Sequence, residues 1–467
     1  MPKFIPIGEE DPMSTLCRMV INTSYEDLPG NVVTFAKYSI LDGIGITIGG
    51  SAFEGIPAVV DLVKSKGGKP ESMIPFYGGK APASEAAFAI GPMARALDFG
   101  QVHTEGDHCT EYIVPALLAA VGLKEKVTGK EFLTAFAVGQ ELLIRIGMAF
   151  RANSQGAPLG REQGHFIFGA TAAVGKLLGL SQEELENAEG IARTMTQPHD
   201  MAMYVHHDLM VSVHHGFVCQ DAINACLLAK RGITGPRQQV LTAPKGYLGF
   251  AKWETDPDAL TKGLGEKWEM LDTEFKAQPT GRCTSASIDG TLELVKKHNL
   301  KAEDIASIDI DECSLNWAFS CQPKQAKWNP QTVAECQFSM PYLVATAVYN
   351  KSVFLDSYTP EAMAREDVRE LMTRITARED STLPVFAARV NITLKNGNKY
   401  TKEYLYPRGH PKNPLTEQEL IDKFKRCVPY SAHKLDDAVV DSLIKALLTL
   451  EAVDDVNTVL IVPLTPL

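Results

Sequence analysis

The sequence predicts a mainly α protein, with a large helical domain built from both ends of the chain and a smaller α+β domain inserted between them. Apolar residues recur at helical spacing up to about residue 250 and again over 415–450. The alternation of apolar and polar residues that is typical of strands appears at 305–315 and 385–405. We therefore expect a helical domain over 1–269, an α+β domain over 270–405, and C-terminal helices over 406–467 that return to the first domain.

The N-terminal part begins with two expected amphipathic helices between residues 27 and 66, which are rich in small residues and so can pack closely. Residues 67–84 are dense in glycine and proline and predict a surface loop. A helix is expected over 85–97, with a kink or restart at Pro92 because proline removes one backbone hydrogen bond.

Two further helices carry the capping-box signal, an N-terminal Thr or Ser followed three residues later by Glu. The pairs are Thr128 with Glu131, before an apolar helix over 128–150, and Ser181 with Glu184, before a helix over 181–196. Buried helices are also expected over 168–178 and 217–231. Within the expected helix over 128–150, Glu141 and Arg145 lie four residues apart, which favours an internal ion pair over a role in binding substrate carboxylates.

The α+β domain is expected to contain strands over 305–315 and 385–394. The dipeptide Asn396-Gly397 then predicts a hairpin turn into a third strand over 399–405. Helical periodicity returns over 415–450.

The overall charge excludes some classes of partner. The 467 residues carry a net charge of −11, which argues against nucleic acid and anionic membrane surfaces. We find no leader-like start and no apolar run of about 18 residues, so we expect a cytoplasmic protein. The nine cysteines form no CxxC pair, which argues against zinc-ribbon, thioredoxin and iron–sulfur sites.

The passage from Met93 to Ala120 is the strongest candidate for chemistry, because titratable groups interrupt an apolar helical run there. An unpaired buried charge costs on the order of several kcal/mol, so a purely structural helix would not contain several titratable residues so close together. The titratable residues are Asp98, His103, Glu105, Asp107, His108 and Glu111. Eight of the eleven histidines lie between positions 103 and 215, which also favours a site in this part of the chain.

Five ordered passages resemble the MmgE/PrpD family, which includes 2-methylcitrate dehydratases, cis-aconitate decarboxylases and an iminodisuccinate epimerase. They are ALDFGQVHTEGDHCTEYIVPALLA, FGATAAVGKLLGL, HHGFVCQDAINACLLAKRGITGP, QFSMPYLVATAV and YPRGHPKNPLTEQELIDKFK. The resemblance implies a helical domain from both chain ends, an inserted α+β lid domain, a homodimer, and a site without a cofactor between helical domain and lid.

Carried over position by position, the resemblance places Asp98 on the first aspartate of the family's LDFDD passage and His108 on the histidine that usually precedes proline. Tyr342 matches an active-site tyrosine of the decarboxylases, and Lys276 a lysine at the lid boundary. The chain departs from the family pattern at several positions that are usually acidic, threonine, lysine or histidine: Gly100, Gln101, Val102, Val211 and Ser285, together with a histidine missing near Gly160.

The family's reactions move a proton on or off a carbon next to a carboxylate. Histidine suits the proton step, because its ordinary pKa is near operating pH, and Arg and Lys suit the carboxylates. We therefore expect Asp98, His103, His108 and Tyr342 to be catalytic. We expect Lys276, Arg282, Arg161, His165, His207 and His214 to bind a small anionic carboxylate substrate, with no metal and no cofactor.

Each assignment has a structural alternative. Asp98 could be a helix-terminus residue, His103 a loop histidine, and Tyr342 a core aromatic with a satisfied hydroxyl. Lys276 and Arg282 could be solvated charges at a domain boundary.

The expected function is a cofactor-independent lyase, either a dehydratase or a decarboxylase, acting on a small di- or tricarboxylic acid. Three alternatives stay open. They are an epimerase or isomerase on the same fold, a metal-dependent lyase or hydrolase that uses the histidine cluster, and an inactive binding descendant of the fold.

Overall fold

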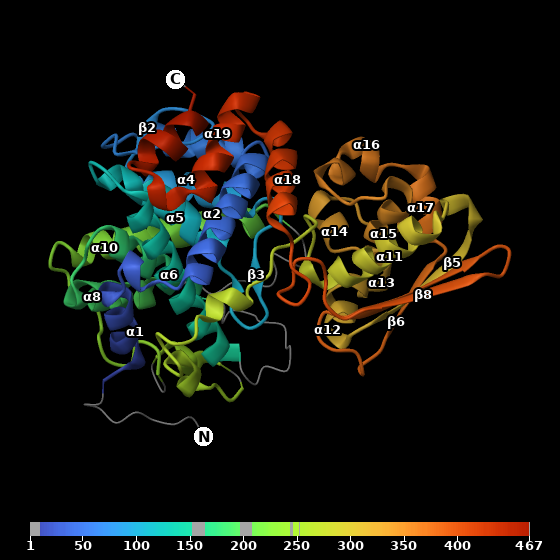
Figure 1. Ribbon diagram of the computed structural model, residues 1–467, viewed down its shortest axis with the longest axis horizontal. Coiled ribbons are helices and arrows are strands. Elements are labelled where there is room, and N and C mark those ends of the chain that lie inside the picture. Colours follow the sequence, from blue (N-terminus) through green and yellow to red (C-terminus); the bar gives the residue numbers. More distant parts are fainter. Residues whose placement is uncertain (1–9, 152–163, 197–207, 243–245, 252, 467) are drawn as a thin grey trace. The chain divides into compact units, whose positions relative to one another are not determined.

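A computed structural model describes residues 10–151, 164–196, 208–242, 246–251 and 253–466. The chain divides into two compact units. Unit 1 comprises residues 1–96, 100–273 and 416–467, and unit 2 comprises residues 97–99 and 274–415. The mainly α fold predicted from the sequence is confirmed (Figure 1).

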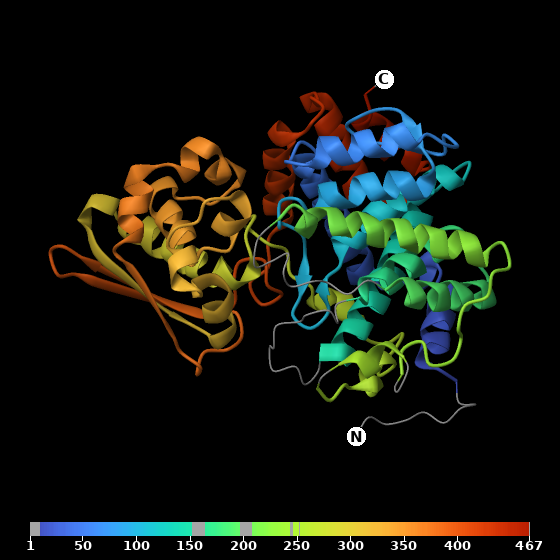
Figure 2. The ribbon, with the colours of Figure 1, turned by 180° about the vertical axis from the view of Figure 1, so that it is seen from behind.

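Unit 1 is a helical bundle whose core is formed by nearly continuous apolar helices. Its longer helices are α1 (Pro12–Asn22), α2 (Gly30–Gly50), α3 (Ile56–Lys66), α4 (Ala83–Arg95), α5 (Thr110–Ala120), α6 (Gly129–Arg151), α7 (Phe166–Leu177), α8 (Gln182–Met195), α10 (Met210–Ala229), α18 (Glu417–Cys427) and α19 (Asp437–Leu448). The C-terminal helices α18 and α19 pack against α2, so the two chain ends share one core (Figure 1). Helix α10 packs along α4, and the two lie side by side in Figure 2.

The sequence-based helix boundaries need three corrections. Helix α4 runs through Pro92 without a break, and the expected loop over 67–84 contains the two-residue strands β1 (Ser72–Met73) and β2 (Lys80–Ala81). Helix α10 begins seven residues before the predicted Phe217, so His214 and His215 are helical. Both capping boxes form as predicted, with backbone N–H donors of Glu131 and Glu184 bonded to their Thr and Ser hydroxyls.

The expectation that no apolar run reaches about 18 residues is wrong for α2 and α6. By length and composition alone, both helices are apolar enough to cross a membrane. Their apolar windows are 78% and 94% buried within the structure, which is the pattern of core helices in a folded bundle.

Unit 2 is an α+β unit built on a four-stranded sheet of order β6-β5-β7-β8. The strands are β5 (Ile305–Glu312), β6 (Ile375–Glu379), β7 (Ala388–Leu394) and β8 (Lys399–Tyr404). Strand β5 pairs parallel with β6 and antiparallel with β7, and β7 pairs with β8 through the predicted hairpin, where Gly397 takes a positive φ of 89°. Strand β6 was not predicted from the sequence.

Helices α11 (Ser285–His298) and α15 (Met340–Asn350) cover one face of this sheet and form the core of unit 2 with it (Figure 1). The strict alternation of burial along β7 directs Val390 and Ile392 into that core. The remaining helices are α12 (Ser314–Asn316), α13 (Lys324–Lys327), α14 (Val333–Gln337), α16 (Pro360–Met363) and α17 (Glu366–Met372).

Candidate active site

The polar passage between α4 and α5 folds in unit 1 as a small hairpin. Strands β3 (Val102–His103) and β4 (Asp107–His108) pair antiparallel, with Val102 opposite His108. The hairpin turn lies close against α6, where Gly106 of the turn faces Gly147 of the helix. A Cβ at position 147 would lie only 2.7 Å from the Cα of Gly106, so a side chain there would prevent this approach. Two glycines therefore let the hairpin approach the helix closely, which gives its histidines a rigid support.

His103 closes the hairpin turn. Its Nδ1 accepts hydrogen bonds from the backbone N–H of Gly106 at 2.8 Å and of Glu105 at 3.2 Å. The ring is 5% exposed. Because Nδ1 accepts, the neutral ring carries its proton on Nε2, and the imidazole is committed to one tautomer by the backbone.

His165 supports the same turn from α7. Its Nε2 lies 3.1 Å from the carbonyl oxygen of Gly106, and its Nδ1 lies 3.4 Å from the Tyr247 hydroxyl. A carbonyl only accepts, so Nε2 is the protonated nitrogen and Nδ1 accepts from the tyrosine. The structure thus places His165 in the support of the hairpin; its predicted role in substrate binding stays a prediction.

His108 differs from His103 and His165 in its partner and its exposure. Its Nδ1 lies 3.0 Å from Oε1 of Glu111, one helical turn further along the chain. The Glu111 side chain is fully buried, whereas that of His108 is 17% exposed. A histidine held by a buried carboxylate at the edge of solvent is the arrangement that general acid–base catalysis uses.

His214 lies within α10 and is buried. Burial, together with the nearby Arg95 guanidinium, lowers the pKa of His214 to about 4, so the ring is neutral at pH 7. Its neighbour His215 stacks on Tyr112 with ring centroids 4.2 Å apart. Arg95, 2% exposed at the end of α4, was missed from the sequence, although a basic residue directly before the LDFGQ passage was a signal for it.

A second buried ion pair joins the two ends of the chain in unit 1. Lys423 of α18 lies 2.7 Å from Asp42 of α2, and the two side chains are 6% and 1% exposed. Burial raises the pKa of Asp42, Glu111 raises it further, and Lys423 and Gln101 oppose the shift. Sequence spacing offers no signal for a pair separated by nearly the whole chain.

Two of the predicted residues of unit 2, Asp98 and Lys276, pair with each other. Asp98 belongs to the short stretch 97–99 that is part of this unit, and Lys276 donates to its Oδ1 at 2.9 Å and to its backbone oxygen at 3.1 Å. Asp98 has a positive φ of 46°, which an aspartate tolerates when its surroundings hold it. Gln337 fixes the same stretch by donating to the Leu97 carbonyl at 2.9 Å.

Arg282 and Tyr342 have structural partners. The Arg282 guanidinium is bonded to the buried Glu274 carboxylate, with Nη2 and Oε2 2.6 Å apart, and stacks over Phe386. The Tyr342 hydroxyl donates to the carbonyl of Ser357 within the core of unit 2, and burial raises its pKa. These are the partners expected of a buried ion pair and a core tyrosine; the predicted roles at a substrate stay predictions.

Arg145 follows the structural interpretation. It bonds to Glu141 at 2.7 Å and donates to the carbonyls of Lys262 and Lys267 at 2.9 and 2.8 Å. Arg161 and His207, both predicted to bind substrate, lie outside the described residues. Within the described ranges no group of three or more His, Cys, Asp and Glu side chains is arranged to hold a metal ion.

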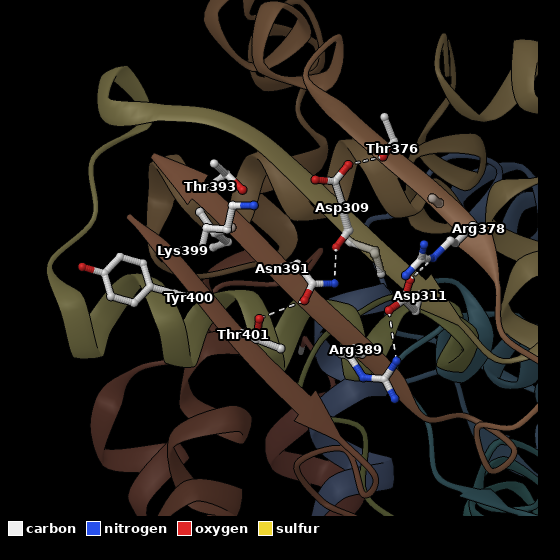
Figure 3. A pocket seen from close by; sticks show the side chains of 13 residues that line it. Asp309, Asp311, Thr376, Arg378, Arg389, Asn391, Thr393, Lys399, Tyr400 and Thr401 are labelled. Carbon is white, nitrogen blue, oxygen red and sulfur yellow. Dashed lines mark hydrogen bonds and ion pairs between the residues drawn. The ribbon is translucent and has the colours of Figure 1, made fainter. Parts of the chain in front are cut away.

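Unit 2 also has a polar hollow of about 500 Å³ on its sheet (Figure 3). Arg378 of β6 and Arg389 of β7 both bond to Asp311 of β5, and Arg389 also reaches Glu403 at 2.6 Å. Because these arginines are paired with carboxylates, the hollow is a less suitable place for an anionic substrate than its size suggests.

The structure therefore defines a helical protein with a histidine–carboxylate pair on a rigid hairpin and a separate α+β unit. Two family models match the chain, the MmgE/PrpD N-terminal domain over residues 14–259 and the MmgE/PrpD C-terminal domain over residues 279–447. The chain belongs to the MmgE/PrpD family, as the resemblance of its five passages predicted.

Curated relatives span nearly the whole chain at low identity. A cis-aconitate decarboxylase-like protein, oryM, of Aspergillus oryzae is 25% identical and covers 95% of each chain. The cis-aconitate decarboxylase of Mus musculus is 24% identical over 94% of this chain and 90% of its own. The 2-methylcitrate dehydratase of Cupriavidus necator is 24% identical over 86% of this chain and 87% of its own.

Proposed function

We propose that this protein is a cofactor-independent lyase that acts on a small di- or tricarboxylic acid by moving a proton at a carbon next to a carboxylate. The observation that carries the proposal is the set of relatives named for two such lyases. Those named cis-aconitate decarboxylase, or like it, align over 80–96% of this chain, and those named 2-methylcitrate dehydratase over 73–86%. Decarboxylation of a cis-aconitate-like acid is therefore the reaction to test first.

The site chemistry supports the proposal through His108. In a decarboxylation the bond to one carboxylate breaks, CO₂ leaves, and the electron pair that stays on carbon takes up a proton. An imidazole held by a carboxylate can donate that proton, and in a dehydration the same group can remove one from carbon. The His108 side chain is 17% exposed, so a substrate can reach its ring, whereas His214 is buried in α10.

The test is proton NMR of the protein in D₂O, treated with a chelator, with cis-aconitate, 2-methylcitrate, citrate, malate, tartrate and iminodisuccinate. We expect cis-aconitate to be replaced by an acid with one carboxylate fewer that carries one deuteron. Loss of water from 2-methylcitrate would instead identify a dehydratase, and deuterium next to a carboxylate without a new product an epimerase. The His108→Gln protein is the control that assigns the activity to this site.

Absence of both turnover and exchange with every acid would contradict the proposal. Activity that appears only when a divalent metal is added back would move the histidines from proton transfer to metal binding. We further propose a cytoplasmic location and, from the family resemblance, a homodimer; light scattering of the purified protein tests the dimer by its mass.

A further inference from the structure

Glu111 is a buried carboxylate that neither the motif match nor the relatives assign to any role. It lies in the first turn of α5, and its Oε1 is 3.0 Å from Nδ1 of His108. At this distance the carboxylate accepts a hydrogen bond from Nδ1–H, and Nε2 becomes the ring nitrogen that can take up or give a proton. We propose that Glu111 is the positioning residue that holds His108 in this tautomer and orientation.

The space around Gly100 supports this assignment. A Cβ built on Gly100 would overlap the carboxyl carbon and both oxygens of Glu111. Gly100 is absent from the glycines with positive φ, so its backbone conformation would allow a side chain, and the three nearest atoms that a Cβ there would meet all belong to the Glu111 carboxyl group. The Glu111 carboxylate therefore occupies the volume that the Cβ of a larger residue at position 100 would need. With Glu111 in this position, residue 100 has to be glycine.

Nearby groups offset part of the cost of a buried negative charge on Glu111. Glu111 lies at the N-terminal end of α5, where the helix dipole stabilises a negative charge. The neighbouring Asp42 carboxyl is paired with Lys423 at 2.7 Å, so a cation of its own compensates that group. His108 is a basic side chain that the Glu111 carboxylate contacts, and an imidazolium that forms there during turnover balances the charge of the carboxylate.

A carboxylate on the non-reacting nitrogen of a catalytic histidine has a known type of effect. It fixes the tautomer and stabilises the imidazolium that forms during turnover, and its replacement by the amide leaves the geometry while it removes the tautomer preference. The proposal rests on the proposed function in that His108 is taken to transfer the proton. The tautomer of His108 can nevertheless be measured without any substrate.

The experiment uses the full-length protein labelled with ¹⁵N in its histidine rings, with the His108 signals assigned by their loss in His108→Gln. The variants are Glu111→Gln, Glu111→Ala, and the double variant Gly100→Asp with Glu111→Ala, which returns a carboxylate to the same volume from the other chain position. The matched control is Glu189→Gln, since Glu189 of α8 is also a fully buried carboxyl of unit 1, and burial raises its pKa well above its usual range.

We expect the wild-type His108 ring to be protonated on Nδ1 and Glu111→Gln to shift the ring toward the other tautomer. With the acid that the wild type turns over, kcat falls about 100-fold or more in Glu111→Gln, by analogy with other carboxylate–histidine pairs, and KM stays within about twofold. The double variant regains at least about tenfold in kcat over Glu111→Ala together with the Nδ1–H signal. Glu189→Gln retains wild-type kcat and the wild-type His108 signals.

Two results would overturn the assignment: a His108 tautomer that is the same in wild type and Glu111→Gln, or kcat within about threefold of wild type in Glu111→Gln. If the wild type turns over none of the acids, the proposed function fails. The ring signals still decide whether Glu111 positions His108, so the two failures are distinguishable.

Discussion

Replacement of Lys423 by methionine tests how strongly a buried ion pair ties the C-terminal helix to the N-terminal part of the bundle. Methionine keeps an unbranched side chain of similar length but lacks the ammonium group, so the Asp42 carboxylate loses the cation that it pairs with. Both side chains are almost completely buried, at 6% and 1% exposure. Removing one member of a buried pair typically costs about 3–5 kcal/mol, because the other charge stays desolvated.

The loss of stability in Lys423→Met depends on pH. Burial already raises the pKa of Asp42 in the wild type, and the loss of Lys423 removes the largest opposing influence. In the variant the folded state therefore keeps a proton on Asp42 that the unfolded chain releases, so the variant becomes less stable as the pH rises. We expect a loss of about 3–5 kcal/mol at pH 8 and a smaller loss at pH 5, where the carboxyl is neutral at little cost.

The assay is hydrogen exchange of peptides from α2 and α18, read by mass spectrometry at both pH values, because the two units need not unfold together. Asp42→Asn combined with Lys423→Met removes both charges and should recover most of the protection. Lys425→Met is the surface control: Lys425 is on the same helix as Lys423, its pair with Asp441 of α19 is exposed, and exchange should stay unchanged. A loss below about 1 kcal/mol at pH 8 would refute the reasoning, since a desolvated pair must cost more.

Three further outcomes are expected. His108→Gln should lower turnover by about 100-fold or more, within the usual range for a lost general acid or base; near-wild-type turnover would remove His108 from the mechanism. Burial raises the pKa of Glu312 from 4.5 to about 8, so the native state holds a proton that the unfolded chain releases, and stability should fall as pH rises between these values. The slope is at most about 1.4 kcal/mol per pH unit, and it should vanish in thermal scans of Glu312→Gln. Because the pKa of His214 is lowered from 6.5 to about 4, the unfolded chain binds a proton that the native state does not; stability should fall as the pH drops through this range, and His214→Gln should flatten that part of the curve.

Features of local origin were predictable from the sequence. The capping boxes at Thr128 and Ser181, the hairpin at Asn396-Gly397 and the ion pair of Glu141 with Arg145 all join residues within four positions, so their geometry follows from helix and turn spacing. The division into helical ends and an α+β insert was predicted for the same reason, since apolar periodicity is a local property.

Site residues were harder to predict because their environment is not local. The polar passage was identified, and His108 and Glu111 are only one helical turn apart, yet their pairing depends on α5 beginning between them. Tyr342 has the sequence context of a functional residue, but only folding brings its hydroxyl to the Ser357 carbonyl in the core. Arg282 is similar, since its partner Glu274 is known only once the chain is folded.

The sequence by itself determined most of the helices, the family and the stretch of chain in which titratable residues interrupt the apolar pattern, because each depends on the order of neighbouring residues. Only the tertiary structure decided which charges compensate one another. Asp98 pairs with Lys276, 178 residues further along the chain, and Asp42 pairs with Lys423 across almost the whole chain. Burial makes such pairs obligatory, since an isolated charge is too costly in the core, but it acts through space and leaves no periodic pattern along the sequence.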